Sequence, residues 1–207
     1  MRAMCKVKIY KFLELSTIER NFYKIYRCHL LNSPILYDNI GIINRRNLTM
    51  KDSCTMCNVI EQIKKGENPW FVKEMETGYA ILGWNQHFYG YTLFICKRHV
   101  SELFELDKDY LTKFTWEMSI IAKAVKIAFD AEKINYECLG NGDIHLHWHI
   151  FPRKCGDLLN YGNDGKGPVW WLPKEIMWDP ANKPPMDKLE LMKNKLLEAI
   201  NKELTIN

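Results

Sequence analysis

Histidine occupies every second position between residues 145 and 149, in the run His145-Leu146-His147-Trp148-His149-Ile150-Phe151-Pro152-Arg153. Side chains of an extended strand alternate between two faces, so this pattern predicts a strand over residues 144–151 with all three imidazoles on one face. Leu146, Trp148 and Ile150 then form an apolar opposite face. An apolar back with a histidine-rich front indicates a strand that carries a functional site.

The three imidazoles are expected to have different roles. An imidazole has an ordinary pKa of about 6.5, so it can act as nucleophile, proton donor or metal ligand near neutral pH. Histidines satisfied by hydrogen bonds in a core are the usual interpretation of one such residue, and the strict spacing of three disfavours it. A single metal ion held by all three is also disfavoured. In a strand the Cα atoms of His145 and His149 would lie about 13 Å apart, whereas each ligating nitrogen must come within ~2.1 Å of a zinc ion.

The segment Leu139–Arg153 strongly resembles the signature of histidine triad nucleotide hydrolases and transferases, especially the branch similar to bacterial diadenosine tetraphosphate hydrolases. Upstream, Cys54-Thr55-Met56-Cys57 is similar to the two-cysteine motif of zinc-carrying members, and Gly90–His99 is similar to their strand that ends in Lys-x-His. Together these segments cover roughly residues 51–155, about half of the chain. The resemblance implies an α+β fold with an antiparallel sheet, a long covering helix and a C-terminal helix.

The resemblance also implies a catalytic mechanism. In the family, the histidine equivalent to His147 attacks the α-phosphorus of a nucleotide, and water or another acceptor resolves the covalent nucleotidyl-histidine. A neutral imidazole is a competent nucleophile, and a covalent intermediate divides one difficult displacement into two easier steps. His149 resembles the residue that contacts the α-phosphate and the leaving-group oxygen, where an imidazolium would neutralise charge or donate a proton.

Two amides, Asn141 and Asn85, are the candidate substrate-binding residues. Asn141 resembles the amide with which similar proteins hold the phosphate, although an asparagine beside glycines is also a common turn residue. Members of the family commonly place an aspartate where Gly83 stands and use it on the ribose hydroxyls. Tyr91 stands where a further histidine is often found, and Cys96 stands where a proline is expected. These departures leave the identity of the nucleotide open.

The resemblance to zinc-binding members assigns a structural zinc ion to four residues, Cys54, Cys57, His99 and His145. Two cysteines on one tight turn can both reach a tetrahedral ion, and two neutral histidines would complete a closed set with no open position. Such an ion would stabilise the fold and orient the triad strand. Two other interpretations remain for the cysteines, a redox pair and small buried apolar residues.

Composition narrows the class of protein. The chain has 207 residues, of which 47% are hydrophobic and 13% aromatic, as in a globular protein. Its net charge of +4 is mildly basic and gives no strong nucleic-acid signal. Seven cysteines without disulfide spacing favour a reducing compartment. Without a signal peptide or long apolar span, the expected location is cytoplasmic, with no membrane partner.

Three regions are expected along the chain. Residues 1–50 form an N-terminal extension of unknown role, with a candidate helix at Thr17–His29; an added subdomain, a packed extension and partial disorder all remain open. Residues 51–160 form the catalytic core. Residues 161–207 form a tryptophan-rich loop and a helix that pack on it.

Within the core, segments rich in β-branched and aromatic residues predict strands, and apolar spacings of three and four predict a helix at Asp107–Ala131. The strands are expected at Trp70–Lys73, Gly78–Trp84, Gly90–Cys96, Asn135–Leu139 and Ile144–Phe151. Three strands, a helix and two strands suit an α+β sandwich with an antiparallel sheet.

The C-terminal region has two notable features. Trp170 and Trp171 either line a nucleobase pocket or pack over the sheet, as buried aromatics usually do. A helix is expected over residues 186–204, with an apolar stripe of Leu189, Leu191, Met192, Leu196 and Leu197. It caps the domain or joins a dimer interface, and a homodimer is one candidate assembly because related proteins are often homodimers.

The leading hypothesis is therefore an enzyme, a nucleotide hydrolase or nucleotidyl transferase that works through His147. Dinucleoside polyphosphates are the preferred substrates on resemblance, with nucleoside phosphoramidates or adenylylated acceptors as further candidates. The alternative is a non-catalytic nucleotide sensor or interaction module on the same fold, supported by Gly83 and Tyr91. A third hypothesis is a zinc-stabilised scaffold, which would require neither His147 nor His149.

Overall fold

The structure is a computed structural model that describes residues 54–160 and 166–206, all of which belong to one unit, residues 46–207. The predicted N-terminal extension and the candidate helix within it lie outside the described residues. In chain order the described elements are α2 (Thr55–Lys64), β1 (Phe71–Glu74), β2 (Gly78–Leu82), β3 (Thr92–Cys96), η2 (Leu103–Glu105), α3 (Lys108–Ala128), β4 (Lys133–Glu137), β5 (His147–Arg153), η4 (Val169–Trp171), α4 (Lys174–Met177), η5 (Pro180–Asn182) and α5 (Met186–Ile206).

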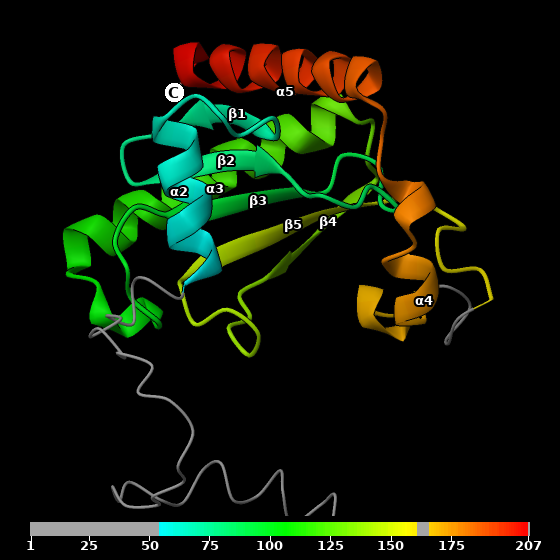
Figure 1. Cartoon of the computed structure of the whole chain (residues 1–207), viewed down its shortest axis with the longest axis horizontal. Coiled ribbons are helices and arrows are strands. Elements are labelled where there is room, and N and C mark those ends of the chain that lie inside the picture. The colour runs from blue at the N-terminus through cyan, green and yellow to red at the C-terminus, as the bar shows by residue number, and fades with distance from the viewer. Residues whose placement is uncertain (1–53, 161–165, 207) are drawn as a thin grey trace, which may run out of the picture. The chain divides into compact units, whose positions relative to one another are not determined.

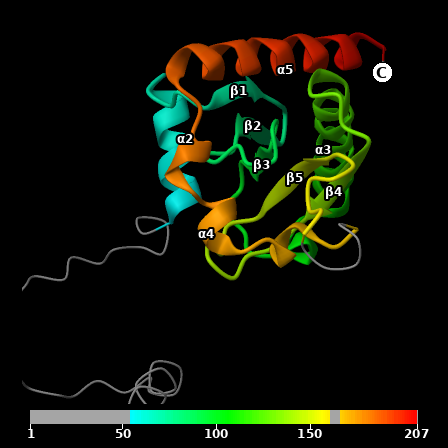
Figure 2. The ribbon, with the colours of Figure 1, turned by 90° about the vertical axis from the view of Figure 1, so that its right-hand side faces the viewer.

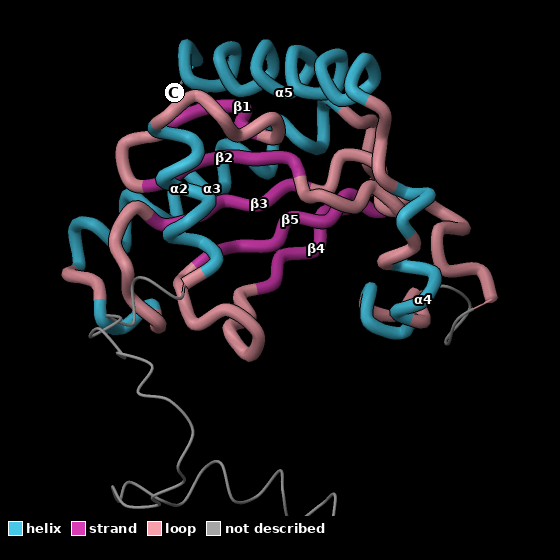
Figure 3. The backbone as a smooth tube through the Cα atoms, viewed as in Figure 1, coloured by secondary structure: helices cyan, strands magenta, loops and turns pink. Residues whose placement is uncertain are grey.

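A five-stranded antiparallel sheet lies at the centre of these elements, with the strand order β1-β2-β3-β5-β4 (Figure 1). The strands run side by side, and helices and loops surround them (Figure 3). The predicted succession of three strands, a helix and two strands is confirmed, and with it the α+β fold class. The central strands β2 and β3 are buried along their whole length, which fits their continuous apolar sequences.

Helix α3 covers one face of the sheet (Figure 2). The side chain of Asp107 accepts a hydrogen bond from the backbone N–H of Tyr110, which caps the start of this helix. Phe114 of α3 stacks on Phe94 of β3, with ring centroids 4.9 Å apart, and Phe94 pairs in register with Trp148 of β5. The apolar back predicted for the histidine strand is therefore the face packed under α3.

Helix α5 packs against α3 and β1. Buried Glu203 of α5 forms an ion pair of 2.6 Å with Lys123 of α3, which links the C-terminal helix to the domain. The predicted apolar stripe is wrong at Leu191, which is 69% exposed. The buried apolar face of α5 consists of Leu189, Met192, Leu196 and Ile200, and Leu191 lies off this face. None of the described helices is both long enough and apolar enough to cross a membrane.

Candidate active site and metal cluster

The strand prediction for the histidine run needs one correction. Strand β5 begins at His147. His145 therefore precedes the strand, and the strand alternation does not set the direction of its ring. The backbone N–H of Leu146 donates to the carbonyl of Val100 at 2.7 Å, and its carbonyl accepts from the N–H of Cys96 at 3.1 Å. These bonds hold the chain beside the end of β3, where the ring of His145 meets the two cysteines. The run therefore divides into His145 on one side and the pair His147 and His149 on the other.

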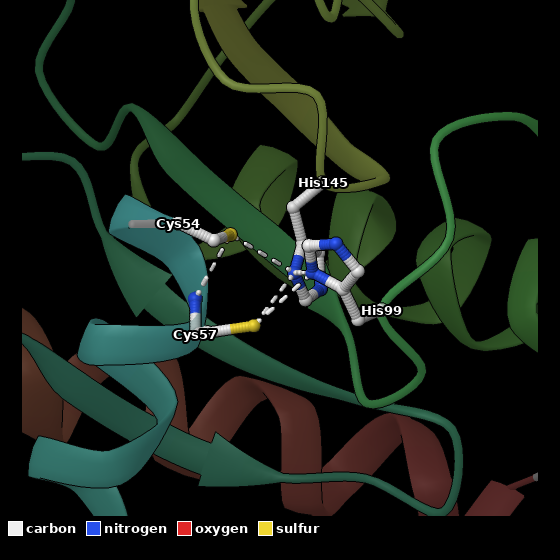
Figure 4. A group of neighbouring side chains, drawn as sticks. All are labelled: Cys54, Cys57, His99 and His145. Atoms are coloured by element: carbon white, nitrogen blue, oxygen red, sulfur yellow. Dashed lines mark hydrogen bonds between the residues drawn. The ribbon is translucent and has the colours of Figure 1, made fainter. Parts of the chain in front are cut away.

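Four side chains from three separate segments of the sequence come together at this point: Cys54, Cys57, His99 and His145 (Figure 4). Their ligand atoms all lie within 4.8 Å of one another. The Nδ1 atom of His145 is 3.5 Å from the Sγ atoms of both Cys54 and Cys57, and 3.3 Å from Nδ1 of His99. Ideal tetrahedral zinc would separate a sulfur and a nitrogen ligand by roughly 3.5 Å and two nitrogens by roughly 3.3 Å. The donor set and its spacing therefore fit zinc.

Local structure explains why these four side chains meet. Cys54 is the N-cap of α2, and its Sγ accepts a hydrogen bond from the backbone N–H of Cys57 in the first turn of that helix. His145 donates its Nε2–H to the carbonyl of Cys96 at 2.7 Å, which leaves Nδ1 to face the sulfurs. A hydrogen bond from the second ring nitrogen to a carbonyl is the usual support of a metal-binding histidine.

His147 is buried at the start of β5 and its tautomer is set by one contact. Its Nδ1 lies 2.6 Å from the carbonyl oxygen of His145, and because a carbonyl only accepts, Nδ1 carries the proton. In a neutral imidazole the other nitrogen, Nε2, then has a lone pair available for bonding. This arrangement presents a nucleophilic nitrogen.

His149 lies beside His147, with ring centroids 4.7 Å apart. Burial, and to a smaller extent the neighbouring His147, together lower the pKa of His149 to about 3. His149 is therefore neutral at pH 7, whereas the sequence favoured an imidazolium. A neutral His149 would act through a ring N–H. Its Nδ1 is 2.6 Å from the hydroxyl of Tyr91, a contact that the sequence did not predict.

A cavity of about 590 Å³ opens over this pair. Asn141 lines it from the loop before β5, so the structure brings this predicted residue to the two histidines. Trp170 and Trp178 line it from the C-terminal region, and their side chains are 46% and 42% exposed. The full lining is Leu139, Gly140, Asn141, Gly142, Asp143, His147, His149, Trp170 and Trp178. The sequence pointed to Trp170, but it gave no signal for Trp178.

The structure does not bring Asn85 to this cavity as far as the described residues show. Its amide nitrogen donates to the carbonyl of Asp179 at 2.9 Å, and its amide oxygen accepts from the backbone N–H of His87 at 3.1 Å. Asn85 thus shapes a turn and holds the C-terminal region, which is an ordinary role for an asparagine in a loop.

Comparison with known proteins agrees with this geometry. A model of the HIT domain family matches residues 64–156. The protein hit of Bacillus subtilis (strain 168) is 30% identical over 126 residues, which are 58% of this chain and 79% of that relative. The chain belongs to the HIT family.

Two solved HIT structures share the fold. A histidine triad protein from Sinorhizobium meliloti 1021 is 25% identical with a TM-score of 0.53, covering 67% of this chain and 93% of that one. A Zn-bound histidine triad family protein from Mycobacterium smegmatis is 21% identical with a TM-score of 0.53, covering 76% of this chain and 99% of that one.

One departure from the HIT pattern has a direct structural effect. Cys96 stands where the family resemblance leads one to expect a proline. The backbone N–H of Cys96, which a proline would lack, donates to the carbonyl of Leu146. This bond extends the contact between β3 and the histidine run beyond the regular strand pairing, directly beside the cluster of two cysteines and two histidines.

Proposed function

We propose that this HIT protein hydrolyses or transfers nucleotides at the α-phosphate, through a covalent nucleotidyl intermediate on His147. The observation that carries the proposal is the 2.6 Å hydrogen bond from Nδ1 of His147 to the carbonyl of His145, at the floor of an open cavity. It fixes the proton on the nitrogen that faces the backbone. The other nitrogen is then free to bond phosphorus.

The proposed reaction has two steps. In the first, Nε2 of His147 forms a bond to the α-phosphorus, and the bond from phosphorus to the leaving group breaks with its electron pair. The imidazole becomes a phosphorylated imidazolium, whose Nδ1–H still faces the carbonyl of His145. In the second, water attacks phosphorus and releases a proton, and the electron pair of the P–N bond returns to Nε2. The nucleotide leaves and the neutral imidazole is restored.

His149 would assist both steps. Its position 4.7 Å from His147, centroid to centroid, puts it next to the phosphoryl oxygens of any nucleotide bonded to Nε2. As a neutral imidazole it would donate a hydrogen bond to a phosphoryl or leaving-group oxygen, where negative charge develops. Asn141, which also lines the cavity, would hold the α-phosphate through its amide.

The walls of the cavity bear on the substrate. Trp170 and Trp178 form a tilted pair with centroids 6.2 Å apart, and they give a planar nucleobase an aromatic surface on which to stack. The sequence resemblance favours dinucleoside polyphosphates such as diadenosine tetraphosphate. Nucleoside phosphoramidates are a second candidate, because Asp143 in the lining would repel a long polyphosphate chain and tolerate an uncharged leaving group.

A structural zinc ion belongs to the same proposal. Cys54, Cys57, His99 and His145 would hold it, and their four ligand atoms would leave no position for substrate. The ion would tie the start of α2 to the chain just before β5. The zinc-bound structure from Mycobacterium smegmatis shares the fold, and the assignment here depends on the donor atoms of this chain.

The decisive experiment detects the covalent adenylyl adduct on histidine. The purified protein is incubated with diadenosine tetraphosphate and, separately, with adenosine phosphoramidate, and an acid-labile adenylyl adduct is sought by mass spectrometry. We expect the adduct on the peptide that contains His147, and the ratio of kcat/KM for the two compounds identifies the preferred class.

Two variants complete the test. His147→Ala should form no adduct, and its turnover should fall by about 10³-fold or more while nucleotide binding persists. His87→Asn is the matched control, because His87 is a half-buried histidine outside the cavity lining, and it should keep both. Turnover by His147→Ala near the wild-type rate would overturn the nucleophile assignment. Nucleotide binding by the wild type without adduct or turnover would favour the non-catalytic sensor.

The proposal also includes the location, the assembly and the ligand of the protein. We propose that it is a cytoplasmic homodimer and that it binds a nucleotide as its substrate. Light scattering in solution tests the assembly, since a monomeric mass at micromolar concentration would contradict it.

A further inference from the structure

Tyr91 is a buried phenol placed against the catalytic histidines. It precedes β3 and is 4% exposed. Its ring stacks on Phe151 of β5, with centroids 4.3 Å apart and planes 2° apart, and lies parallel to the ring of His149. This packing fixes the hydroxyl 2.6 Å from Nδ1 of His149. The contact is therefore built into the core and does not depend on a mobile side chain.

The direction of this hydrogen bond follows from the hydroxyl proton. Burial raises the pKa of Tyr91 well above its ordinary value, so the phenol keeps its proton. Within the described residues, Nδ1 of His149 is the acceptor that the Tyr91 hydroxyl has. A buried O–H without an acceptor is destabilising, so the proton is directed at Nδ1. Nδ1 then accepts, and the proton of the neutral imidazole is on Nε2.

We propose that Tyr91 is a positioning residue that holds His149 in the Nε2–H tautomer, opposite to the tautomer of His147. His147 then presents a lone pair on Nε2, and His149 presents an N–H beside it. One nitrogen can bond phosphorus while its neighbour donates to the oxygens of the same phosphoryl group. This inference extends the proposed function, because it assigns the outer contact that makes His149 a donor.

Gly83 is the second half of this arrangement. A Cβ atom at residue 83 would lie 2.2 Å and 2.3 Å from two ring carbons of Tyr91, far inside van der Waals contact. The ring of Tyr91 thus fills the space that any side chain at position 83 would need. The absent family aspartate and the tyrosine at position 91 are therefore one linked change, in which a ribose contact is replaced by a support for His149.

The test combines spectroscopy with kinetics. The imidazole nitrogens of His149 are observed by ¹⁵N NMR at pH 7 in the full chain, for the wild type, Tyr91→Phe and Tyr79→Phe. We expect the proton on Nε2 in the wild type and a shift of population toward Nδ1–H in Tyr91→Phe, which loses the hydroxyl and keeps the ring. Tyr79→Phe also removes a hydroxyl from a buried tyrosine, and it should match the wild type.

Turnover gives the second measurement. Tyr91→Phe should lower kcat by about tenfold or more with little change in KM, because a misplaced proton weakens the donor and leaves the binding surface intact. A wild-type signal for Nδ1–H on His149, or an unchanged tautomer in Tyr91→Phe, would overturn the proposal. The NMR result does not require turnover, so failure of the proposed activity and failure of this inference are distinguishable.

Discussion

His145 and His149 lie four residues apart in one run, and the structure uses them in opposite ways. His145 donates its Nε2–H to the carbonyl of Cys96 and turns Nδ1 toward two sulfurs and a second imidazole. His149 has Nδ1 2.6 Å from the hydroxyl of Tyr91 and lines the cavity, so in the proposed tautomer its Nε2–H serves the substrate. The outer hydrogen-bond partner therefore decides which ring nitrogen is available, and with it the chemistry of each histidine.

The two environments also differ in closure. The ligand atoms around His145 face one another and fill the positions that a tetrahedral ion requires. The rings of His147 and His149 instead line an open cavity of about 590 Å³. One end of the run is thus suited to stability and the other to substrate, and variants at each end test a different role.

The largest effect is expected at the metal end. Cys57→Ser removes a thiolate from the four-residue cluster, so we expect loss of stoichiometric zinc and a decrease in the free energy of unfolding of about 3 kcal/mol or more. Metal analysis of protein prepared without chelators, followed by thermal unfolding, measures both. Turnover should fall as well, because the proposed zinc ion would orient the chain that leads into His147.

The matched control for this change is Cys155→Ser. Cys155 is exposed and lies outside the cluster, so zinc content and stability should stay at wild-type values. Wild-type protein without zinc, or a Cys57→Ser variant as stable as the control, would refute the metal assignment and return the cysteines to the role of small buried residues.

Much of this division could be predicted from the sequence. The spacing of His147 and His149 placed both on one face of a strand, and the similarity of Cys54-Thr55-Met56-Cys57 to zinc-carrying proteins led to the cluster. The spacing of the histidines could not show that β5 starts at His147. The start depends on the backbone hydrogen bonds of Leu146 with Val100 and Cys96, which are distant in sequence.

Contacts between distant segments were beyond sequence reasoning. Tyr91 was visible as a departure from the family, but its role depends on stacking against Phe151 and on space above Gly83. Asn85 has the amide that a substrate site needs, yet the C-terminal region supplies its partner at Asp179. Single-residue chemistry was therefore easier to predict than the neighbours that direct it.

The contact between Gly83 and Tyr91, beside His149, can be tested by a change in packing. Gly83→Ala forces a methyl group against the ring of Tyr91, so we expect a loss of stability of about 1–3 kcal/mol. In a Tyr91→Ala background the same change should cost much less, which gives a coupling energy of at least about 1 kcal/mol in denaturant unfolding. Gly142→Ala, where an added Cβ meets nothing within 4 Å, is the control. Additive free energies would show that Gly83 and Tyr91 are independent.

The smallest effect concerns protonation of His149. Its folded-state pKa is about 3 and its ordinary value is about 6.5, so between these pH values the unfolded chain binds a proton that the folded protein does not. Stability is therefore fully present above about pH 6.5 and is lost as the pH falls toward 3. Relative to His149→Gln, the wild type should lose about 1 kcal/mol of unfolding free energy between pH 7 and pH 5.5. Taking the difference between the two proteins cancels the zinc ligands and the carboxylates, which titrate in both. Parallel stability profiles would mean that His149 is protonated in the folded state, and it would then resemble a solvated histidine more than the neutral donor that contrasts with His145.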